Sequence, residues 1–325
     1  MSNKAESATP LRGGTLAVGY CSLIGALSTL PGWGLLLFPE LGPLSASVLS
    51  QPSGRWASSP WQLVMVPTAA AVCGLWISDH IPVESLALLL AVLTARLLLS
   101  LLRSSLVPAL SAAALPVILD IHSWAYPMQI ALGLSGLTLL LMVLRRGQRH
   151  VRQSESNIAL KVAVEPGWLQ RWLLYLLVMV ALVQLSGWRV MLLPPLIVIS
   201  HERFAEPEHC PWLGRAWQLP LSCGITATMG VLNARLLASH VALAMAISLG
   251  LTLLLMQRLR LWLPPLLAVA VLPLLLPNAD ARYVLGIVAA AAVLSLSDRR
   301  PAQDGISPPP ARARWWRCAP WAQSR

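Results

Sequence analysis

Three arginines occur inside or directly beside long apolar runs. Arg96 lies about midway along residues 84–102, and Arg103 and Arg260 lie at the ends of such runs. A guanidinium offers planar, bidentate donors that suit a small oxyanion. Because a charge at the centre of a membrane costs about 3 kcal/mol or more, we expect Arg96 either to face a partner or cavity or to snorkel to the interface.

Two interpretations are open for Arg103 and Arg260. Each fits a basic residue at the cytoplasmic end of a helix, where it satisfies the positive-inside rule and the helix dipole. Each also directly precedes a proline-broken segment, beginning at Leu106 or Leu263. Free N–H groups at the starts of such half-helices, together with the guanidiniums, would form an anion site.

Other charged groups lie in the predicted loops. The acidic loop 201–212 has three glutamates, which either pair with Arg55 or Arg203 or stay solvated. Asp120 and His122 either relay protons at the outer surface or form an ordinary polar turn. These alternatives depend on the fold.

Signs of enzymatic or metal chemistry are missing from the sequence. It has no H-E-x-x-H, no G-x-S-x-G and no phosphate-binding Gly-rich loop, and Glu40 is the only acid within an apolar block of the first half. We therefore expect no pair of membrane-embedded carboxylates. His209-Cys210 lacks a second ligand pair, and the five cysteines show no paired spacing. The prediction is a protein that is not an enzyme, with no cofactor, metal or disulfide framework.

Composition indicates the environment of these residues. The chain is 56% hydrophobic and 11% charged, and residues 84–102, 128–144 and 236–256 approach the roughly 20 apolar residues that cross a bilayer. The net charge of +11 is confined to joints and tails, so the positive-inside rule explains it and nucleic-acid binding is not expected. The lipid bilayer is the predicted partner.

The two halves of the chain resemble each other. GWGLLLFPEL at 32–41 aligns with GWRVMLLPPL at 187–196, and with two single-residue slips LVPALSAAALP at 106–116 aligns with LPPLLAVAVLP at 263–273. Ordered matches over about 100 residues indicate a duplication. The predicted fold is an all-α, polytopic integral membrane protein: two parallel, pseudo-symmetric bundles of short and broken helices with ten to twelve apolar segments.

Charge also predicts domains and orientation. The expected division is a cytoplasmic leader (1–14), a first membrane repeat (15–144), a cytoplasmic linker (145–165), a second membrane repeat (166–297) and a basic, disordered tail (298–325). Basic residues in the leader, linker and tail place both termini in the cytoplasm. We expect a multi-pass protein of a bacterial-type inner membrane, compatible with a homo-oligomer.

Proline interrupts several apolar segments, and lipid does not tolerate irregular backbone. These breaks should therefore face protein or a water-filled cavity. They are Pro31-Gly32, Pro39, Pro43, Pro194-Pro195 and Pro264-Pro265.

Short motifs in both halves resemble the HPP membrane-protein family, named for a His-Pro-Pro motif. The first half carries Leu36-Leu37-Phe38, Gln51-Pro52, Gly74, Arg103, Pro108 and Ala109; the second carries Glu206-Pro207, Gly230, Arg260, Pro264 and Pro265. The motif's His is replaced by Leu106 and Leu263, its first Pro by Val107 in the first half, and Glu206 stands where the family has Gln. The resemblance implies a compact helical membrane domain and nitrite transport, and the missing His puts the transported ion in doubt.

These observations lead to a membrane transporter or channel for a small, nitrite-like anion, with its site between the repeats. The alternative is a non-transporting scaffold or assembly subunit that binds partner helices. The predicted substrate-binding residues are Arg96, Arg103, Arg260, Gln51, Pro52, Glu206, Pro207, Pro108, Pro264 and Pro265. A transporter should bring the arginines toward a shared hydrated cavity.

Overall fold

The computed structural model describes residues 9–147 and 167–297, apart from residues 53, 208, 209, 213, 277 and 278. All regular secondary structure in this part of the chain is helical, which confirms the predicted all-α fold. The predicted leader, linker and tail lie mostly or wholly outside the described residues. At their edges the helices run further than predicted, because α2 begins at Thr9 and α7 ends at Gly147.

The helices follow the same order in both halves. The first half contains α2 (Thr9–Leu27), η1 (Gly34–Leu36), α3 (Leu41–Ser50), α4 (Pro60–His80), α5 (Glu84–Leu101), α6 (Ala109–Ile118) and α7 (Ala125–Gly147). The second half contains α8 (Trp168–Ser186), η2 (Arg189–Leu192), α9 (Pro194–Ala205), α10 (Gln218–Leu236), α11 (Val241–Leu259), α12 (Pro265–Val271), η4 (Leu272–Leu274) and α13 (Ala281–Leu296). Each half thus has a long helix, a 3₁₀ turn with a short helix, two long helices, a short helix that follows a proline, and a last longer helix.

Several helices are suited to lipid. Among the described residues, five helices are long and apolar enough to cross a membrane: α4, α5, α7, α8 and α11. Large apolar side chains point outward from them, and Leu97, Leu139 and Leu174 are 57%, 64% and 63% exposed. Such surfaces are unfavourable in water, whereas hydrocarbon solvates them. These are the features of a membrane-embedded helical protein.

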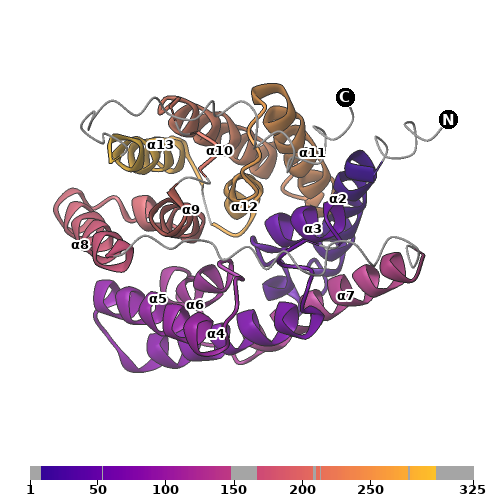
Figure 1. The fold of residues 1–325 in the computed structure, drawn as a ribbon, viewed down its shortest axis with the longest axis horizontal. Helices are drawn as coiled ribbons and strands as arrows, with labels where there is room; N and C mark the ends of the chain where they lie inside the picture. The colour runs from indigo at the N-terminus through magenta and orange to yellow at the C-terminus, as the bar shows by residue number, and fades with distance from the viewer. Residues whose placement is uncertain are drawn as a thin grey trace.

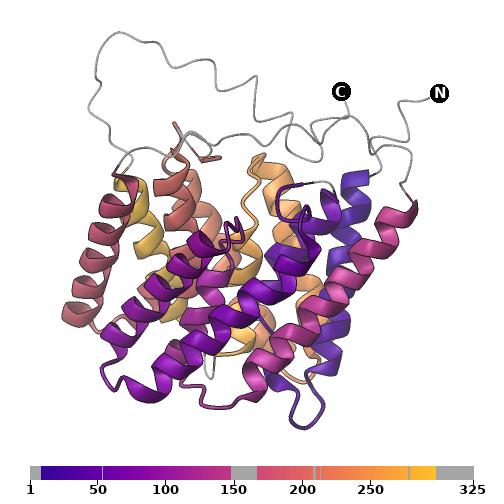
Figure 2. The same cartoon turned by 60° about the horizontal axis from the view of Figure 1, so that its bottom comes forward.

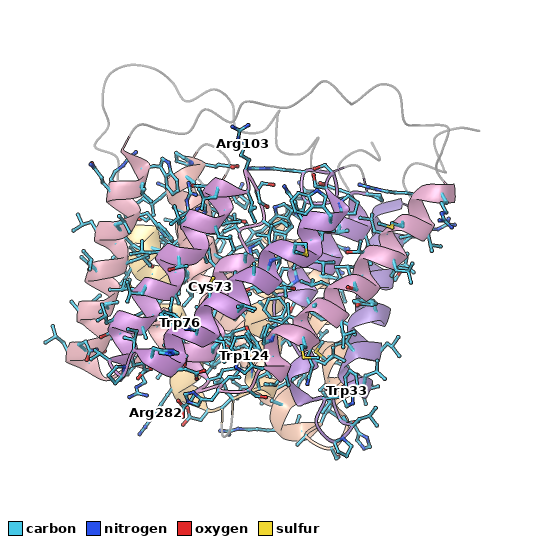
Figure 3. All side chains as sticks on the ribbon, turned by 90° about the horizontal axis from the view of Figure 1, so that it is seen from below. Trp33, Cys73, Trp76, Arg103, Trp124 and Arg282 are labelled. Atoms are coloured by element: carbon cyan, nitrogen blue, oxygen red, sulfur yellow. The ribbon has the colours of Figure 1, made fainter. Side chains whose placement is uncertain are left out.

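The long helices connect two opposite faces of the molecule (Figure 2). Figure 3 places Arg103 at one face and Trp33, Trp124 and Arg282 at the other. We call these the Arg103 face and the Trp124 face. Trp33 and Trp124 are exposed, as expected for indoles at a membrane–water interface.

Four short helices, α3, α6, α9 and α12, lie in the middle of the molecule, and the longer helices surround them (Figure 1). Helix α3 packs on α12, and α6 packs on α9, so the short helices of the two halves contact one another. Both α3 and α6 have 10 residues, which corresponds to about 15 Å. Each therefore crosses about half of an apolar layer roughly 30 Å thick.

The proline breaks lie mainly inside this central group, as predicted. The buried prolines are Pro39, Pro43, Pro194, Pro195 and Pro265, and Pro264 is half-buried. Pro31 and Gly32 differ, because both are exposed in the turn after α2. Protein groups bond the backbone of that turn all the same: Gln129 Nε2 donates to the carbonyl oxygen of Gly32 at 2.7 Å, and the N–H of Trp33 donates to the carbonyl oxygen of Leu30 at 3.0 Å.

Close backbone contacts hold α6 and α12 in place. A Cβ atom added to Gly74 of α4 would lie 2.1 Å from the carbonyl oxygen of Ala113 in α6. A Cβ atom added to Gly230 of α10 would lie 2.5 Å from the carbonyl oxygen of Ala270 in α12. No side chain fits at either position, so the two glycines permit this packing.

A buried tyrosine makes a second contact of the same kind in each half. The hydroxyl of Tyr126 in α7 donates to the carbonyl oxygen of Ala112 at 2.8 Å. The hydroxyl of Tyr283 in α13 donates to the carbonyl oxygen of Val269 at 2.7 Å. Both bonds satisfy a buried hydroxyl and fix a long helix against a short one.

The two halves meet along two seams that differ. Helix α2 packs directly along α11 at one seam. At the other seam, α5 and α8 approach each other less closely within the described chain. An ion pair joins this second seam at the Trp124 face, where Arg189 Nη1 lies 2.9 Å from Glu84 Oε2.

Candidate functional site

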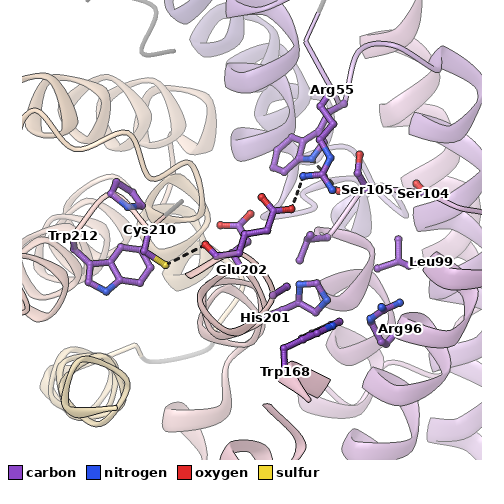
Figure 4. A pocket seen from close by; sticks show the side chains of 15 residues that line it. Arg55, Arg96, Leu99, Ser104, Ser105, Trp168, His201, Glu202, Cys210 and Trp212 are labelled. Carbon is purple, nitrogen blue, oxygen red and sulfur yellow. Dashed lines mark hydrogen bonds and ion pairs between the residues drawn. The ribbon is translucent and has the colours of Figure 1, made fainter. Parts of the chain in front are cut away.

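A pocket of about 260 Å³ lies in the looser seam. The first half contributes residues of the 51–59 loop, of α5 and of the segment before α6, and the second half contributes residues of α8, α9 and the following loop (Figure 4). Its lining residues with polar groups are Arg55, Trp56, Arg96, Ser104, Ser105, Trp168, His201, Glu202, Glu206, Cys210 and Trp212. The pocket is therefore a mixed polar and aromatic site between the halves.

Arg96 enters this pocket from α5. Its guanidinium carbon lies 5.1 Å from the centre of the Trp168 ring, a cation–π arrangement. Its Nη1 also donates to Ser100 one turn along the helix, and its Nε has no hydrogen-bond partner among the described residues. Of the two alternatives for Arg96, the structure supports the one in which it faces a partner and a cavity.

His201 lies beside Arg96 on the last turns of α9. The side chain is buried, and its ring meets Trp168 and Trp172 edge to face, with centroids 5.1 Å and 5.0 Å apart. Neither ring nitrogen has a hydrogen-bond partner among the described residues. A buried polar group without a partner costs free energy, so His201 is poised to bind a polar group that enters the pocket.

The position of His201 corrects the predicted boundary of the loop. Residues 201–212 were expected to form a solvated loop, but α9 continues to Ala205 and buries both His201 and Arg203. The polar run His201–Phe204 resembles a loop by composition. Trp168 and Trp172 of α8 cover it, which no local pattern indicates.

An ion pair between the halves closes one side of the pocket. Arg55 Nη1 lies 2.6 Å from Glu206 Oε1, with side chains 54% and 24% exposed. The structure therefore decides one open alternative: this glutamate pairs with Arg55. Both residues line the pocket and come from loops that end the central helices α3 and α9.

The 51–59 loop is held from within its own half. Arg145 of α7 donates from Nε and Nη2 to the carbonyl oxygen of Pro52, at 2.9 Å and 2.6 Å. Its Nη2 also donates to the carbonyl oxygen of Ala57. Gln51 and Pro52 thus form a fixed turn beside the pocket, and neither lines it.

The structure places only some of the predicted site residues in the pocket. Arg96 and Glu206 line the pocket, and the other predicted residues do not. Arg103 and Arg260 are exposed at the ends of α5 and α11, where both have left-handed backbone, with φ of 47° and 52°. Figure 3 shows Arg103 at the surface. This position fits the topological interpretation of Arg103.

The predicted prolines have structural positions. Pro108 and Pro264 precede the first residues of α6 and α12, and Pro265 begins α12. Pro207 is buried directly after Glu206. Proline at these points starts a helix without a wasted N–H donor.

Sequence reasoning missed several pocket residues. Trp212 is buried, lines the pocket and has no hydrogen-bond partner for its indole Nε1 among the described residues. Ser104 and Ser105 follow Arg103 and line the pocket in its place. In the sequence, they are marked only by their place in the short segment between Arg103 and Pro108, which turns back into the protein.

A second polar cluster lies at the Trp124 face. His122 bridges two carboxylates, with Nδ1 2.6 Å from Asp79 Oδ1 and Nε2 3.0 Å from Asp120 Oδ1. The hydrogen bonds to Asp79 and then to Asp120 raise the pKa of His122 above its ordinary value. The predicted polar turn at Asp120 and His122 is therefore an ordered cluster that also includes α4.

Within the described residues, no group of three or more His, Cys, Asp or Glu side chains is arranged to hold a metal ion. The fold and the pocket define the class: a membrane-embedded helical protein with a polar and aromatic pocket between its two halves. No family model, curated protein or solved structure matches this chain.

Proposed function

We propose that this protein is a membrane transporter or channel for a small anion, which binds in the pocket between the halves. The observation that carries the proposal is the set of buried nitrogen atoms without hydrogen-bond partners in Arg96, His201 and Trp212, three residues that line one pocket. Guanidinium and indole N–H groups are donors only, and a neutral imidazole also has one N–H. An oxyanion would satisfy these donors.

We also propose that the two halves arose by duplication and are related by an axis along the membrane normal. Support comes from the shared order of helices, the glycine contacts at Gly74 and Gly230, and the tyrosine bonds from Tyr126 and Tyr283. Arg103 and Arg260, at the ends of α5 and α11, both have left-handed backbone and add a further match. Chance similarity of Leu-rich segments would not produce these same contacts in the same order.

Nitrite is the proposed ion because the repeated motifs resemble the HPP family, and nitrite is small and planar enough for a guanidinium to bind bidentately. We place the Arg103 face in the cytoplasm of a bacterial-type inner membrane, since the basic joints gather there by the positive-inside rule. Association into a homo-oligomer is part of the same hypothesis.

Nitrite uptake into proteoliposomes tests the proposal. The wild-type protein should take up nitrite faster than protein-free vesicles. Arg96→Gln should reduce that uptake by about tenfold or more, because a charge-assisted hydrogen bond contributes about 1.5–3 kcal/mol.

Arg282→Gln is the matched control, because it removes an exposed arginine at the opposite face. It should leave uptake unchanged. Uptake by the wild type at the rate of protein-free vesicles would reject transport and favour the scaffold alternative.

A further inference from the structure

Glu40 is a carboxylate inside the central group of short helices. The residue is fully buried, and its Oε1 accepts a hydrogen bond from Ser111 Oγ at 2.7 Å. Its Oε2 has no hydrogen-bond partner among the described residues. An ionised, half-satisfied carboxylate is strongly disfavoured in a membrane interior, so Glu40 is a candidate functional group rather than a stabilising one.

The depth of Glu40 follows from the length of α3. Glu40 directly precedes this 10-residue helix, which ends at Ser50 beside the 51–59 loop. At 1.5 Å per residue, Glu40 lies about 15 Å below that loop, which is near the middle of a bilayer core. Glu202 is three residues from the end of α9, so it lies roughly 10 Å closer to the Arg103 face.

Among the described residues, the groups that the structure brings near Glu40 are hydroxyls, a thiol and a carboxyl group. Helix α7 contributes Tyr126, and α2 contributes the thiol of Cys21, which lies against α3. Helix α6 contributes Ser111, and α12 has no titratable residue. Helix α9 packs on α6 and α12 and carries Glu202, so the negative charge of this second carboxyl group acts on Glu40. Because the electrostatic partner is another acid, the two carboxylates cannot both ionise at low cost.

Glu202 connects this buried acid to the pocket, because it lines the pocket as well as interacting with Glu40 (Figure 4). The sequence did not suggest a pair of membrane-embedded carboxylates, since Glu202 was assigned to a loop. Because α9 continues through Glu202 to Ala205, the two carboxylates form a pair. This pair reaches from the pocket to the membrane interior.

The charge of the pocket gives this pair a role. Two arginines, Arg55 and Arg96, and two glutamates, Glu202 and Glu206, line the pocket. With all four ionised the formal charges cancel, so the empty pocket does not attract an anion. One proton on Glu202 leaves a single positive charge, which balances one bound monovalent anion. Anion binding and proton binding therefore favour each other in this pocket.

We infer that Glu202 and Glu40 carry the proton of a proton-coupled anion transporter, with one proton moved for each anion; this inference rests on the proposed function. A proton from bulk water forms an O–H bond on Glu202 while the anion binds beside Arg96. That O–H bond then breaks as water beside Glu202 accepts the proton and passes it to Glu40, where a new O–H bond forms. Glu202 returns to a carboxylate and Glu40 becomes the neutral acid. Release of the proton to water on the opposite side breaks the O–H bond on Glu40, restores its carboxylate and completes the transfer.

Proteoliposomes with an imposed pH gradient test this inference. With nitrite as the probe and the inside more alkaline by one unit, the initial uptake rate above that of protein-free vesicles should rise by up to about tenfold over the rate without a gradient, because one unit is a tenfold ratio of proton concentrations. A pH dye inside the vesicles should report proton entry when nitrite is added. Subtracting protein-free vesicles removes the permeation of nitrous acid.

Glu40→Gln is the main variant, because it keeps the volume and the acceptor for Ser111 but cannot take up a proton. It should still bind and move nitrite, while the ratio of rates with and without the gradient falls to about one and the nitrite-induced proton signal is lost. Glu202→Gln should abolish the same pH response and serves if Glu40→Gln fails to fold. Glu84→Gln, at the Trp124 face, is the control and should respond like the wild type.

The outcomes separate the two proposals. Nitrite flux in the wild type without any response to the gradient, or a full response in both Glu40→Gln and Glu202→Gln, would overturn proton coupling and leave anion transport intact. A wild-type protein that moves no nitrite would remove the proposed function and this inference with it.

Discussion

Two ion pairs cross the looser seam, one at each face. Arg55 meets Glu206 at 2.6 Å, and Arg189 meets Glu84 at 2.9 Å. All four side chains are partly or largely exposed, so each pair contributes no more than about 1 kcal/mol to stability. Their role is positional, because they join the halves at the two ends of a seam whose middle holds the pocket.

His122 bridges two carboxylates outside that seam, at the Trp124 face. Its two ring nitrogens reach Asp79 on α4 and Asp120 in the turn before α7. Asp120 has left-handed backbone, with φ of 52°. This conformation ends α6, because the N–H of Ile121 donates back to the carbonyl oxygen of Pro116 at 2.9 Å across the left-handed residue.

This cluster predicts a pH dependence of stability. The two carboxylates raise the pKa of His122 in the folded protein, so protonated His122 stabilises the fold. The contribution is complete below the unfolded pKa of about 6.5 and is lost as the pH rises through the higher folded value. Thermal unfolding in detergent should therefore show a midpoint that falls between about pH 6.5 and the folded pKa, and His122→Gln should flatten that decline.

His80→Gln is the control for this measurement, because His80 is exposed at the same face but contacts Trp76 rather than a carboxylate. It should keep the wild-type pH profile. An unaltered profile in His122→Gln would show that the cluster does not contribute to stability.

Helix α9 illustrates what the sequence could and could not predict. Its start was predictable, because Pro194 and Pro195 interrupt an apolar run and favour the first turn of a helix. Its end was not, because His201–Phe204 is polar and was assigned to a loop. The side chains that bury this turn, Trp168 and Trp172, belong to α8, more than two dozen residues earlier. Local composition carries no information about such a contact.

The candidate site shows the same division. Arg96 was predictable, because a charge within an apolar helix requires a partner. The sequence also favours Arg103 and Arg260, because each precedes a proline-broken segment. In the structure the chain turns at both residues, and in the first half the next residues, Ser104 and Ser105, line the pocket. Which neighbour of a turn faces inward is set by backbone conformation, which the sequence pattern did not specify.

The close approach of α4 to α6 gives a prediction about stability. In Gly74→Ala the new methyl group would lie 2.1 Å from the carbonyl oxygen of Ala113, so one helix must shift. Overpacking of this kind typically costs about 1–3 kcal/mol. Thermal unfolding in detergent should show a clearly lowered midpoint, and Gly230→Ala should behave in the same way because of Ala270.

Gly250→Ala in α11 is the matched control, because no atom lies within 4 Å of an added Cβ there. It should be neutral or slightly stabilising, since alanine restricts the unfolded chain. Equal midpoints for all three alanine variants would contradict the proposed close packing.

The two seams between the halves differ, and the pocket described above lies in the looser one. Helices α2 and α11 pack along each other, which fills one seam. Helices α5 and α8 are held by Arg96 over Trp168 and by the terminal ion pairs instead. Under the proposed duplication, identical seams would give two equivalent sites or none. The two seams differ in packing, and the pocket lies in the looser one.

The proposed transport through this seam would have a direction, and the orientation of the two faces is testable. If the positive-inside rule governs this chain, the Arg103 face is cytoplasmic and the Trp124 face, with Arg282, is external.

Single cysteines at positions 103 and 282, placed in a variant without the five native cysteines, report which side of the membrane each position faces through labelling with a membrane-impermeant maleimide. Arg282→Cys should be labelled in intact cells, and Arg103→Cys only after the membrane is opened. Both residues are exposed, so a failure to label would reflect the membrane rather than burial. The reverse pattern would place the pocket, Glu202 and the proton entry at the outer surface, and would make the inward proton gradient act on the opposite end of the carboxylate pair.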